Sequence, residues 1–383
     1  MSERRTYRRQ RRGRRGAVVA IVATAVVLVG GATAAAAVAM AGGFAFAAGA
    51  AASPSATHSP APAPSPTPHT AEQQLLMEAE DRNACVVSFA GDDVTSAPML
   101  QPIGVLYAGL PIPAREGAVF AGWYTTPEDA AALAIPGRVN GSELVACTDH
   151  QVTLNAAWVT PEANAAENAR IPILMYHQFT TNPAGEAGWL KGNYAYIADF
   201  DAHMNHIATT GFYLPTWDEL SAFIDGRLYL PKHSVIVTDD DADQTWFDLA
   251  APVVDKYKVL ATSFMITAWR QDAAPNPYVL RRSHTHDMHR AGDNGKGRIV
   301  NLAPAEIAAD MQTSAAILGV KEVMAYPFGH FNDTAKEGLR QAGFEMARTI
   351  EPGYVTIGTD KLALPTVRIN YGMGLDALVN LIG

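Results

Sequence analysis

A run of acidic residues in the second half of the chain has the composition of a metal site. It follows the apolar stretch Ser-Val-Ile-Val-Thr at 234–238 and reads Asp-Asp-Asp-Ala-Asp at 239–243. Four carboxylates in five positions repel one another unless a cation compensates their charge, and divalent cations favour such ligands. The spacing lacks the glycine-centred pattern of an EF-hand, although a calcium loop of another kind is an open alternative.

A second cluster, further along the chain, is rich in histidine. Residues 283–289 read Ser-His-Thr-His-Asp-Met-His, which places three of the eleven histidines within six residues. Imidazole is a common zinc ligand, and two histidines with one carboxylate leave coordination positions open for catalysis. Such a site activates water near neutral pH, and a second carboxylate can act as the general base. The residues alone therefore predict metal-assisted hydrolysis, with a solvated loop as the alternative for the histidines.

Alternating strands and helices must position these two clusters. Continuous apolar runs predict buried strands at 171–176, 234–238, 262–267 and 323–326. Apolar residues between 197 and 207 recur at helical spacing, and Thr-Trp-Asp-Glu at 216–219 is a capping box that begins a helix. Buried strands separated by helices imply an α/β fold with a parallel sheet or barrel, whose active residues lie at the carboxyl ends of strands.

Six segments of this region, in chain order, carry a resemblance to a known family. They are Ile-Leu-Met-Tyr-His at 173–177, Leu-Pro-Lys-His-Ser-Val-Ile-Val-Thr-Asp-Asp-Asp at 230–241, Ala-Thr-Ser-Phe-Met-Ile-Thr at 261–267, Ser-His-Thr at 283–285 followed by His289, Ala-Tyr-Pro-Phe-Gly at 325–329 and Leu-Ala-Leu-Pro at 362–365. The region resembles the polysaccharide deacetylases of carbohydrate esterase family 4. The resemblance implies a distorted (β/α) barrel that removes N-acetyl or O-acetyl groups from chitin-like polymers, peptidoglycan or xylan.

The resemblance also implies roles for individual residues. Asp240 corresponds to the catalytic base, and Asp241, His284 and His289 correspond to the three metal ligands. The expected metal is zinc, although two histidines and one aspartate also accept cobalt, nickel or iron. His177 resembles a histidine that some extracellular poly-N-acetylglucosamine deacetylases place near the site, so we assign it a catalytic role. The alternative for His177 is a core histidine bonded to the backbone.

The sequence departs from the family pattern in the motif that carries the base. Where the family has Thr-Phe-Asp-Asp-Gly, this chain has Asp239 in place of Phe and Ala242 in place of Gly. Asp239 is therefore an alternative base, and Ala242 is acceptable unless the turn needs a positive φ. The family's common arginine before the Tyr-Pro-Phe-Gly segment is missing, since residues 325–327 read Ala-Tyr-Pro.

A late Leu-x-His motif, which supplies the general acid in many family members, is also absent. No histidine follows His330, which we interpret as a surface loop residue. His177 or His286 could take that role, and Arg368 could orient a carboxylate or be a charge at the barrel rim. These departures leave two alternatives to an N-deacetylase: an inactive barrel that binds glycan, and an O-acetyl esterase of the xylan type.

The N-terminal part of the chain predicts export and attachment to a membrane. Residues 1–16 carry eight arginines and one glutamate, and residues 17–52 carry no charge. We interpret 1–16 as a cytoplasmic tail and 17–52 as a transmembrane anchor or a cleaved signal segment. Residues 53–79 follow as a linker whose proline-rich start predicts an extended spacer. The later domains are then extracytoplasmic, or secreted if the segment is cleaved. The net charge of −9 argues against a nucleic-acid partner.

Residues 80–160 predict a small β-rich domain ahead of the deacetylase-like region at 168–383. Phe-Ala-Gly-Trp-Tyr at 120–124 and Leu-Asn-Ala-Ala-Trp at 154–158 resemble the Listeria–Bacteroides repeat of bacterial surface proteins, which is β-grasp-like. Cys85 and Cys147 lie within this domain, and outside the cytoplasm two thiols in one small domain predict a disulfide.

Taken together, these features predict a membrane-tethered, metal-dependent polysaccharide deacetylase outside the cytoplasm. The tether favours a substrate close to the membrane, so peptidoglycan or an exported poly-N-acetylglucosamine is the expected glycan. Trp189, Trp246 and Trp269 are candidates for stacking on sugar rings, with core or rim packing as the alternative for each.

Overall fold

The computed structural model describes residues 69–270 and 276–383. Residues Pro66–Gly383 form one compact unit. The predicted basic tail at 1–16, the apolar segment at 17–52 and the proline-rich start of the linker lie outside the described residues. Within the described ranges, no helix combines the length and the apolar character needed to cross a bilayer.

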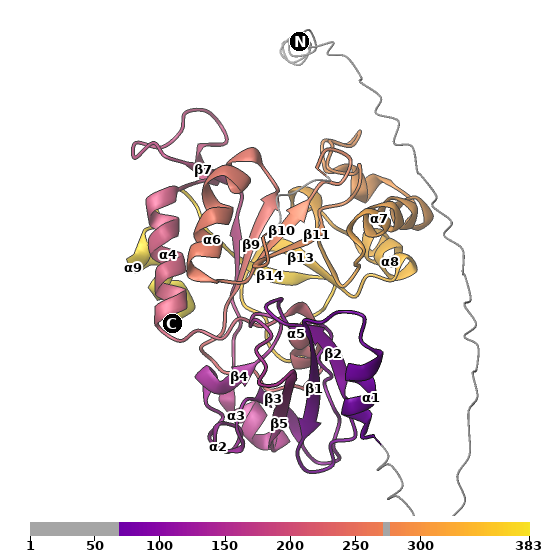
Figure 1. The fold of residues 1–383 in the computed structure, drawn as a ribbon. Coiled ribbons are helices and arrows are strands. Elements are labelled where there is room, and N and C mark those ends of the chain that lie inside the picture. The colour runs from indigo at the N-terminus through magenta and orange to yellow at the C-terminus, as the bar shows by residue number, and fades with distance from the viewer. Residues whose placement is uncertain (1–68, 271–275) are drawn as a thin grey trace, which may run out of the picture. The chain divides into compact units, whose positions relative to one another are not determined.

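The larger part of the unit is a closed barrel of parallel strands in the order β10-β11-β12-β13-β14-β6-β9 (Figure 1). Its strands are β6 (Ile173–Tyr176), β9 (Ile236–Asp241), β10 (Ala261–Met265), β11 (Val279–Ser283), β12 (Val323–Ala325), β13 (Met346–Pro352) and β14 (Leu364–Arg368). The apolar runs form strands because both faces are buried, one in the barrel interior and the other under helices. The barrel has seven strands, and the register between β13 and β14 is irregular. It is therefore the distorted (β/α) barrel that the sequence predicts.

Helices and short segments surround the barrel. They are α4 (Ile197–Thr209), α5 (Trp217–Ile224), α6 (Ala251–Tyr257), α7 (Pro304–Leu318), α8 (Asp333–Ala342) and α9 (Leu375–Ile382), with the short turns η2 (Lys191–Asn193), η3 (Trp246–Ala250), η4 (Arg298–Asn301) and η5 (Pro327–Gly329) and the two-stranded sheet of β7 (Gln178–Thr180) and β8 (Tyr194–Tyr196). Helix α4 buries Phe200, Met204 and Ile207, which are the residues at helical spacing. Helix α5 begins with the predicted capping box, in which Thr216 and Glu219 bond each other's backbone N–H.

A second sheet precedes the barrel and has the strand order β2-β1-β5-β3-β4. Its strands are β1 (Ala84–Ala90), β2 (Met99–Pro102), β3 (Val119–Tyr124), β4 (Arg138–Val139) and β5 (Gln151–Val159), accompanied by α1 (Ala71–Glu78), α2 (Pro127–Ala132), η1 (Ile135–Gly137) and α3 (Pro161–Glu167). Phe120 and Trp123 are buried in its core, and the structure contains the predicted Cys85–Cys147 disulfide. Helix α1 occupies the last part of the segment that the sequence assigned to the linker, after the stretch predicted to be extended, because Thr70 and Gln73 form a capping box that starts a helix there.

This sheet covers the amino end of the barrel. Phe120 of β3 pairs with the segment before β9, since its N–H donates to Arg227 O and its carbonyl accepts from Tyr229 N–H. Apolar side chains of the sheet share one hydrophobic cluster with the first residues of five barrel strands, Ile173, Ile236, Val323, Met346 and Leu364. Trp217 of α5 belongs to the same cluster and donates its indole N–H to Thr262 of β10 at 2.9 Å. The carboxyl ends of the strands, at the opposite end, are therefore left for the polar clusters.

Candidate metal centre and active site

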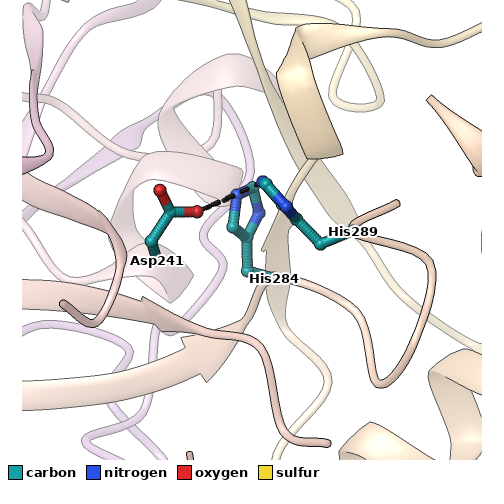
Figure 2. Close-up of side chains that lie close together, drawn as sticks. All are labelled: Asp241, His284 and His289. Carbon is teal, nitrogen blue, oxygen red and sulfur yellow. Dashed lines mark ion pairs between the residues drawn. The ribbon is translucent and has the colours of Figure 1, made fainter. Parts of the chain in front are cut away.

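The three predicted metal ligands come together at the carboxyl end of the barrel. Asp241 is the last residue of β9, His284 directly follows β11, and His289 lies in the loop after it. One ligand atom from each lies within 4.8 Å of the others. His284 Nε2 is 3.4 Å and His289 Nε2 is 3.2 Å from the same carboxylate oxygen, Asp241 Oδ1 (Figure 2). This group is a possible three-residue metal site.

Local hydrogen bonds hold these ligands in place. The Nδ1–H of His284 donates to Ala325 O at 2.8 Å, which leaves its Nε2 free toward Asp241. The loop that carries His289 is held by Asp310 of α7, whose carboxylate accepts from the backbone N–H groups of His286 and Asp287 at 2.7 and 2.8 Å. The ligand positions are therefore set by strand ends and a helix rather than by loose loops.

The chemistry of this donor set fits a divalent cation. When His284 donates through Nδ1, its Nε2 and the nearby Asp241 Oδ1 present lone pairs to each other with no proton between them. Burial alone would lower the pKa of His284, but the neighbouring Asp241 carboxylate raises it above its usual value. Burial likewise raises the pKa of Asp241, but the two imidazoles lower it well below its usual range. A cation bound between these atoms would satisfy all three ligands without protonating a histidine.

Asp240 lies beside the metal ligands and is buried, with 3% of its surface exposed. Its Oδ1 accepts a hydrogen bond from the guanidinium of Arg348, and its Oδ2 is 3.6 Å from His177 Nε2. Burial raises the pKa of Asp240, but Arg348, His177 and His284 together lower it below the usual value. Asp240 is therefore an ionised carboxylate. Arg348 holds one of its oxygens through a hydrogen bond, and the other oxygen is directed toward His177.

Asp239, the alternative base, has a different environment. Side chains alternate along a strand, so Asp239 points to the face of β9 opposite to Asp240. It is fully buried, accepts from Ser263 Oγ at 3.3 Å, and does not line the cavity that contains Asp240. Burial raises its pKa well above the usual value. The geometry therefore favours Asp240 over Asp239 as the residue that can reach a substrate.

The turn after β9 does need positive φ values. Asp241 has φ 73° and Ala242 has φ 48°, which is the left-handed region where a side chain is disfavoured. Ala242 is therefore strained where the family pattern has glycine. From the sequence, Ala242 was expected to be acceptable only if the turn did not need a positive φ. The structure shows that the turn does need one.

The histidines considered for a general acid are separated by the fold. His177 lines the same cavity as Asp240, and among the described residues its Nδ1 has no hydrogen-bond partner, which does not support the alternative of a backbone-bonded core histidine. His286 Nδ1 pairs with Thr267 Oγ1 at 3.1 Å, and His330 Nδ1 accepts from Gly297 N–H at 2.8 Å. Neither His286 nor His330 lines this cavity. His177 is therefore the histidine placed to exchange a proton with a substrate.

The cavity above these residues has a volume of about 360 Å³ and an apolar rim. Trp189 stands at its mouth with 90% of its surface exposed, beside Phe328 at 44% and Ile350 at 39%. Trp269 is 57% exposed and lies against His289, whereas Trp246 is fully buried in the core and cannot contact a sugar. Two of the three tryptophans singled out in the sequence are thus available at this end of the barrel.

Two arginines contribute to the site in different ways. Arg368 lines the cavity mouth, where it donates to the side-chain oxygens of Asn370 and Asn193 and not to a carboxylate. Arg348, which the sequence analysis did not single out, is completely buried and binds Asp240. It comes from β13, and its Cα pairs in register with Ala325 of β12, the position where the family's arginine is missing. One charged residue within the apolar run of β13 was the signal that could have revealed it.

Comparison with known proteins agrees with the motifs. Residues 228–347 match the family model of polysaccharide deacetylases. The poly-β-1,6-N-acetyl-D-glucosamine N-deacetylase of Staphylococcus aureus (strain MRSA252) is 28% identical over 161 residues, covering 37% of this chain and 56% of that relative. The Bacillus subtilis (strain 168) protein YxkH is 25% identical over 231 residues, covering 57% of this chain and 76% of YxkH. The chain thus spans little more than half the length of the staphylococcal enzyme.

Two solved structures have a similar chain path. Streptococcus pyogenes deacetylase PplD matches with a TM-score of 0.48 and 22% identity, over 56% of this chain and 99% of PplD. IcaB from Ammonifex degensii matches with a TM-score of 0.46 and 20% identity, over 56% of this chain and 96% of IcaB. The resemblance of residues 80–160 to the Listeria–Bacteroides repeat stays a prediction, as do the domain boundaries.

Proposed function

We propose that the protein is a zinc-dependent polysaccharide N-deacetylase that acts outside the cytoplasm. The observation that carries the proposal is the grouping in one cavity of three convergent ligand atoms, an ionised carboxylate at Asp240 and a histidine at His177. The two imidazoles and one carboxylate suit zinc, and cobalt, nickel or iron would also be accepted.

The reaction proposed is hydrolysis of an acetamido group. A divalent cation held by Asp241, His284 and His289 would supply a Lewis acid and lower the pKa of a water molecule. Asp240 would accept a proton from a water molecule as the water adds to the acetyl carbonyl carbon. His177 lies 3.6 Å from Asp240 and gives a proton to the leaving nitrogen as the C–N bond breaks. The products are acetate and a free amine.

The proposed substrate is a polymer of N-acetylglucosamine. The staphylococcal relative is named for poly-β-1,6-N-acetyl-D-glucosamine, which supports a polymer of that type. The glycan strand of peptidoglycan is the second candidate substrate. The exposed Trp189 and Phe328 at the cavity mouth present apolar faces of the kind that pack on sugar rings. The predicted N-terminal anchor, or a secreted form after cleavage, would keep the enzyme near such glycans.

Acetate release tests the proposal. The purified full chain would be stripped of metal with a chelator, reloaded with zinc and offered poly-β-1,6-N-acetylglucosamine, peptidoglycan and acetyl-xylan. We expect zinc-dependent release from an N-acetylated glycan and at least a 100-fold lower kcat in Asp240→Asn, which keeps the shape but cannot accept the proton (roughly 10²–10⁴-fold for a general base).

The matched control is Asp239→Asn, which changes the neighbouring buried carboxyl on the opposite face of β9 and should keep most of the activity. Release from acetyl-xylan alone would replace the proposal with an O-acetyl esterase. A zinc-loaded chain that releases acetate from none of the glycans would replace it with an inactive glycan-binding barrel.

A further inference from the structure

A second cavity, with a volume of about 270 Å³, adjoins the cavity of the proposed active site, since Gly329 lines both. Its walls come from the loop before α7 and from the turn before α8. The ring of Phe328, at the rim of the first cavity, lies 4.3 Å from the ring of His289 and 6.0 Å from that of His330, which lines the second. One aromatic ring therefore separates the second cavity from the predicted metal ligands. It lies where a glycan held at the metal site would place its next sugar.

The loop of residues 291–297 that forms one wall of this cavity is fixed by its contacts. Ala291 and Gly297 pair as an antiparallel bridge, which closes the loop. The backbone N–H of Gly297 donates to His330 Nδ1 at 2.8 Å. A Cβ atom at position 297 would lie 3.1 Å from the Phe328 ring, so the loop packs closely on the opposite wall. The cavity is therefore preformed.

Three side chains of the second cavity offer hydrogen-bond donors that have no partner among the described residues. His330 Nδ1 accepts from Gly297 N–H, so its Nε2 carries the ring proton. Asn294 Oδ1 accepts from the backbone N–H of Lys296 and from Asn301 Nδ2, both at 3.0 Å, which leaves Asn294 Nδ2 as a donor. The exposed ammonium of Lys296 forms no ion pair within the described ranges.

Among the described residues, no acidic side chain lines this cavity. Asp293 belongs to the same loop and Asp333 is the first residue of α8, but neither lines it. Three donors, one of them a cation, suit an anionic group, because hydrogen bonds to ionised acceptors are the stronger ones. A carboxylate accepts several hydrogen bonds at once and so matches this set of donors.

Resting on the proposed function, we propose that the second cavity is a subsite for a sugar that carries a carboxylate, next to the N-acetylglucosamine that loses its acetyl group. Lys296 pairs with the carboxylate, and His330 and Asn294 donate hydrogen bonds to it. Of the two candidate substrates, poly-β-1,6-N-acetylglucosamine has no such group. The glycan strand of peptidoglycan has one on every second sugar, the lactyl carboxylate of N-acetylmuramic acid, once the stem peptide is removed. The subsite therefore favours peptidoglycan strands freed of stem peptides.

The test compares two forms of one oligomer in which N-acetylglucosamine alternates with N-acetylmuramic acid. One form keeps the free lactyl carboxylates, and in the other they are converted to primary amides of almost the same size. With the zinc-loaded full chain, we expect kcat/KM for acetate release to be about 10-fold higher for the carboxylate form, the scale of one charge-assisted hydrogen bond. The preference should shrink as salt is added. Lys296→Met should bring the ratio close to one, and Lys296→Glu should favour the amide.

Lys232 supplies the matched control, because it is exposed and lies in the segment before the amino end of β9. Lys232→Met makes the same change in net charge and should keep the wild-type ratio. Equal kcat/KM for the two forms in wild type, an unchanged ratio in Lys296→Met, or the same loss in Lys232→Met would overturn the subsite while the deacetylase stands. Acetate release from poly-β-1,6-N-acetylglucosamine but from neither oligomer would also overturn it. A wild-type chain that releases acetate from no glycan would overturn the proposed function, and the subsite with it.

Discussion

Loss of the Cys85–Cys147 disulfide should destabilise the whole unit and leave catalysis intact. The bridge closes a loop of 62 residues between β1 and the segment before β5. Freeing a loop of that length increases the entropy of the unfolded chain, which lowers the free energy of unfolding by about 4 kcal/mol. For a unit of about 320 residues, that loss lowers Tm by roughly 6 °C.

The assay is urea or thermal unfolding of oxidised and reduced wild type, compared with the double variant Cys85→Ala/Cys147→Ala. Reduced wild type keeps both sulfur atoms and so isolates the effect of the loop. The double variant should lose more, because Cys85 is fully buried in the cluster shared with the barrel. Since that cluster joins sheet and barrel, both should unfold in one transition.

The proposed zinc-dependent acetate release serves as the control for the site. The site lies at the opposite end of the barrel from the shared cluster and should keep its kcat. Equal unfolding midpoints for oxidised and reduced protein would refute the loop-entropy reasoning. Two well-separated transitions, one for the sheet and one for the barrel, would refute the single cooperative unit.

Three further substitutions test other parts of the structure. His289→Ala leaves two of three ligands and should weaken zinc binding by more than about 100-fold, measured by chelator competition; unchanged affinity would contradict the assigned ligand set. Trp189→Ala removes an aromatic ring that is 90% exposed, so it should raise KM for polymeric substrate up to about 10-fold with no change in Tm. An equal KM in wild type and variant would show that Trp189 is not part of the binding surface. Trp246→Ala empties a fully buried site against Phe179 and Phe200 and should cost about 3–5 kcal/mol in urea unfolding, whereas a loss below about 1 kcal/mol would show that the core around η3 relaxes to fill the space.

Strand and helix positions in the barrel could be predicted from the sequence because they rest on local patterns. The apolar runs around 173–176, 236–238 and 262–265 form buried strands. The apolar residues at helical spacing in α4 form the buried face of that helix. The secondary structure at the amino-terminal end of the described chain was predicted less well. Helix α1 depends on two side chains, Thr70 and Gln73, in a stretch next to prolines, where composition alone favours an extended chain.

The site shows the same division between local and long-range information. The metal ligands could be predicted from motif order, since Asp241 ends β9, His284 directly follows β11 and His289 lies in the loop after it. Choosing between Asp239 and Asp240 required knowing which face of β9 points into the cavity. Finding Arg348 required knowing that β13 stands across the barrel interior from β9, a relation between residues 108 positions apart that no local pattern encodes.

The sequence by itself determined which residue types are present and which short segments form strands and helices, because hydrophobic periodicity and capping act over a few residues. Tertiary structure alone decided that Arg348 contacts Asp240, that His177 rather than His286 or His330 faces Asp240, and that the second sheet shares its core with the amino end of the barrel. The physical reason is that barrel closure brings side chains from distant strands within hydrogen-bonding range, and the free energy of those contacts depends on a geometry that exists only in the folded chain.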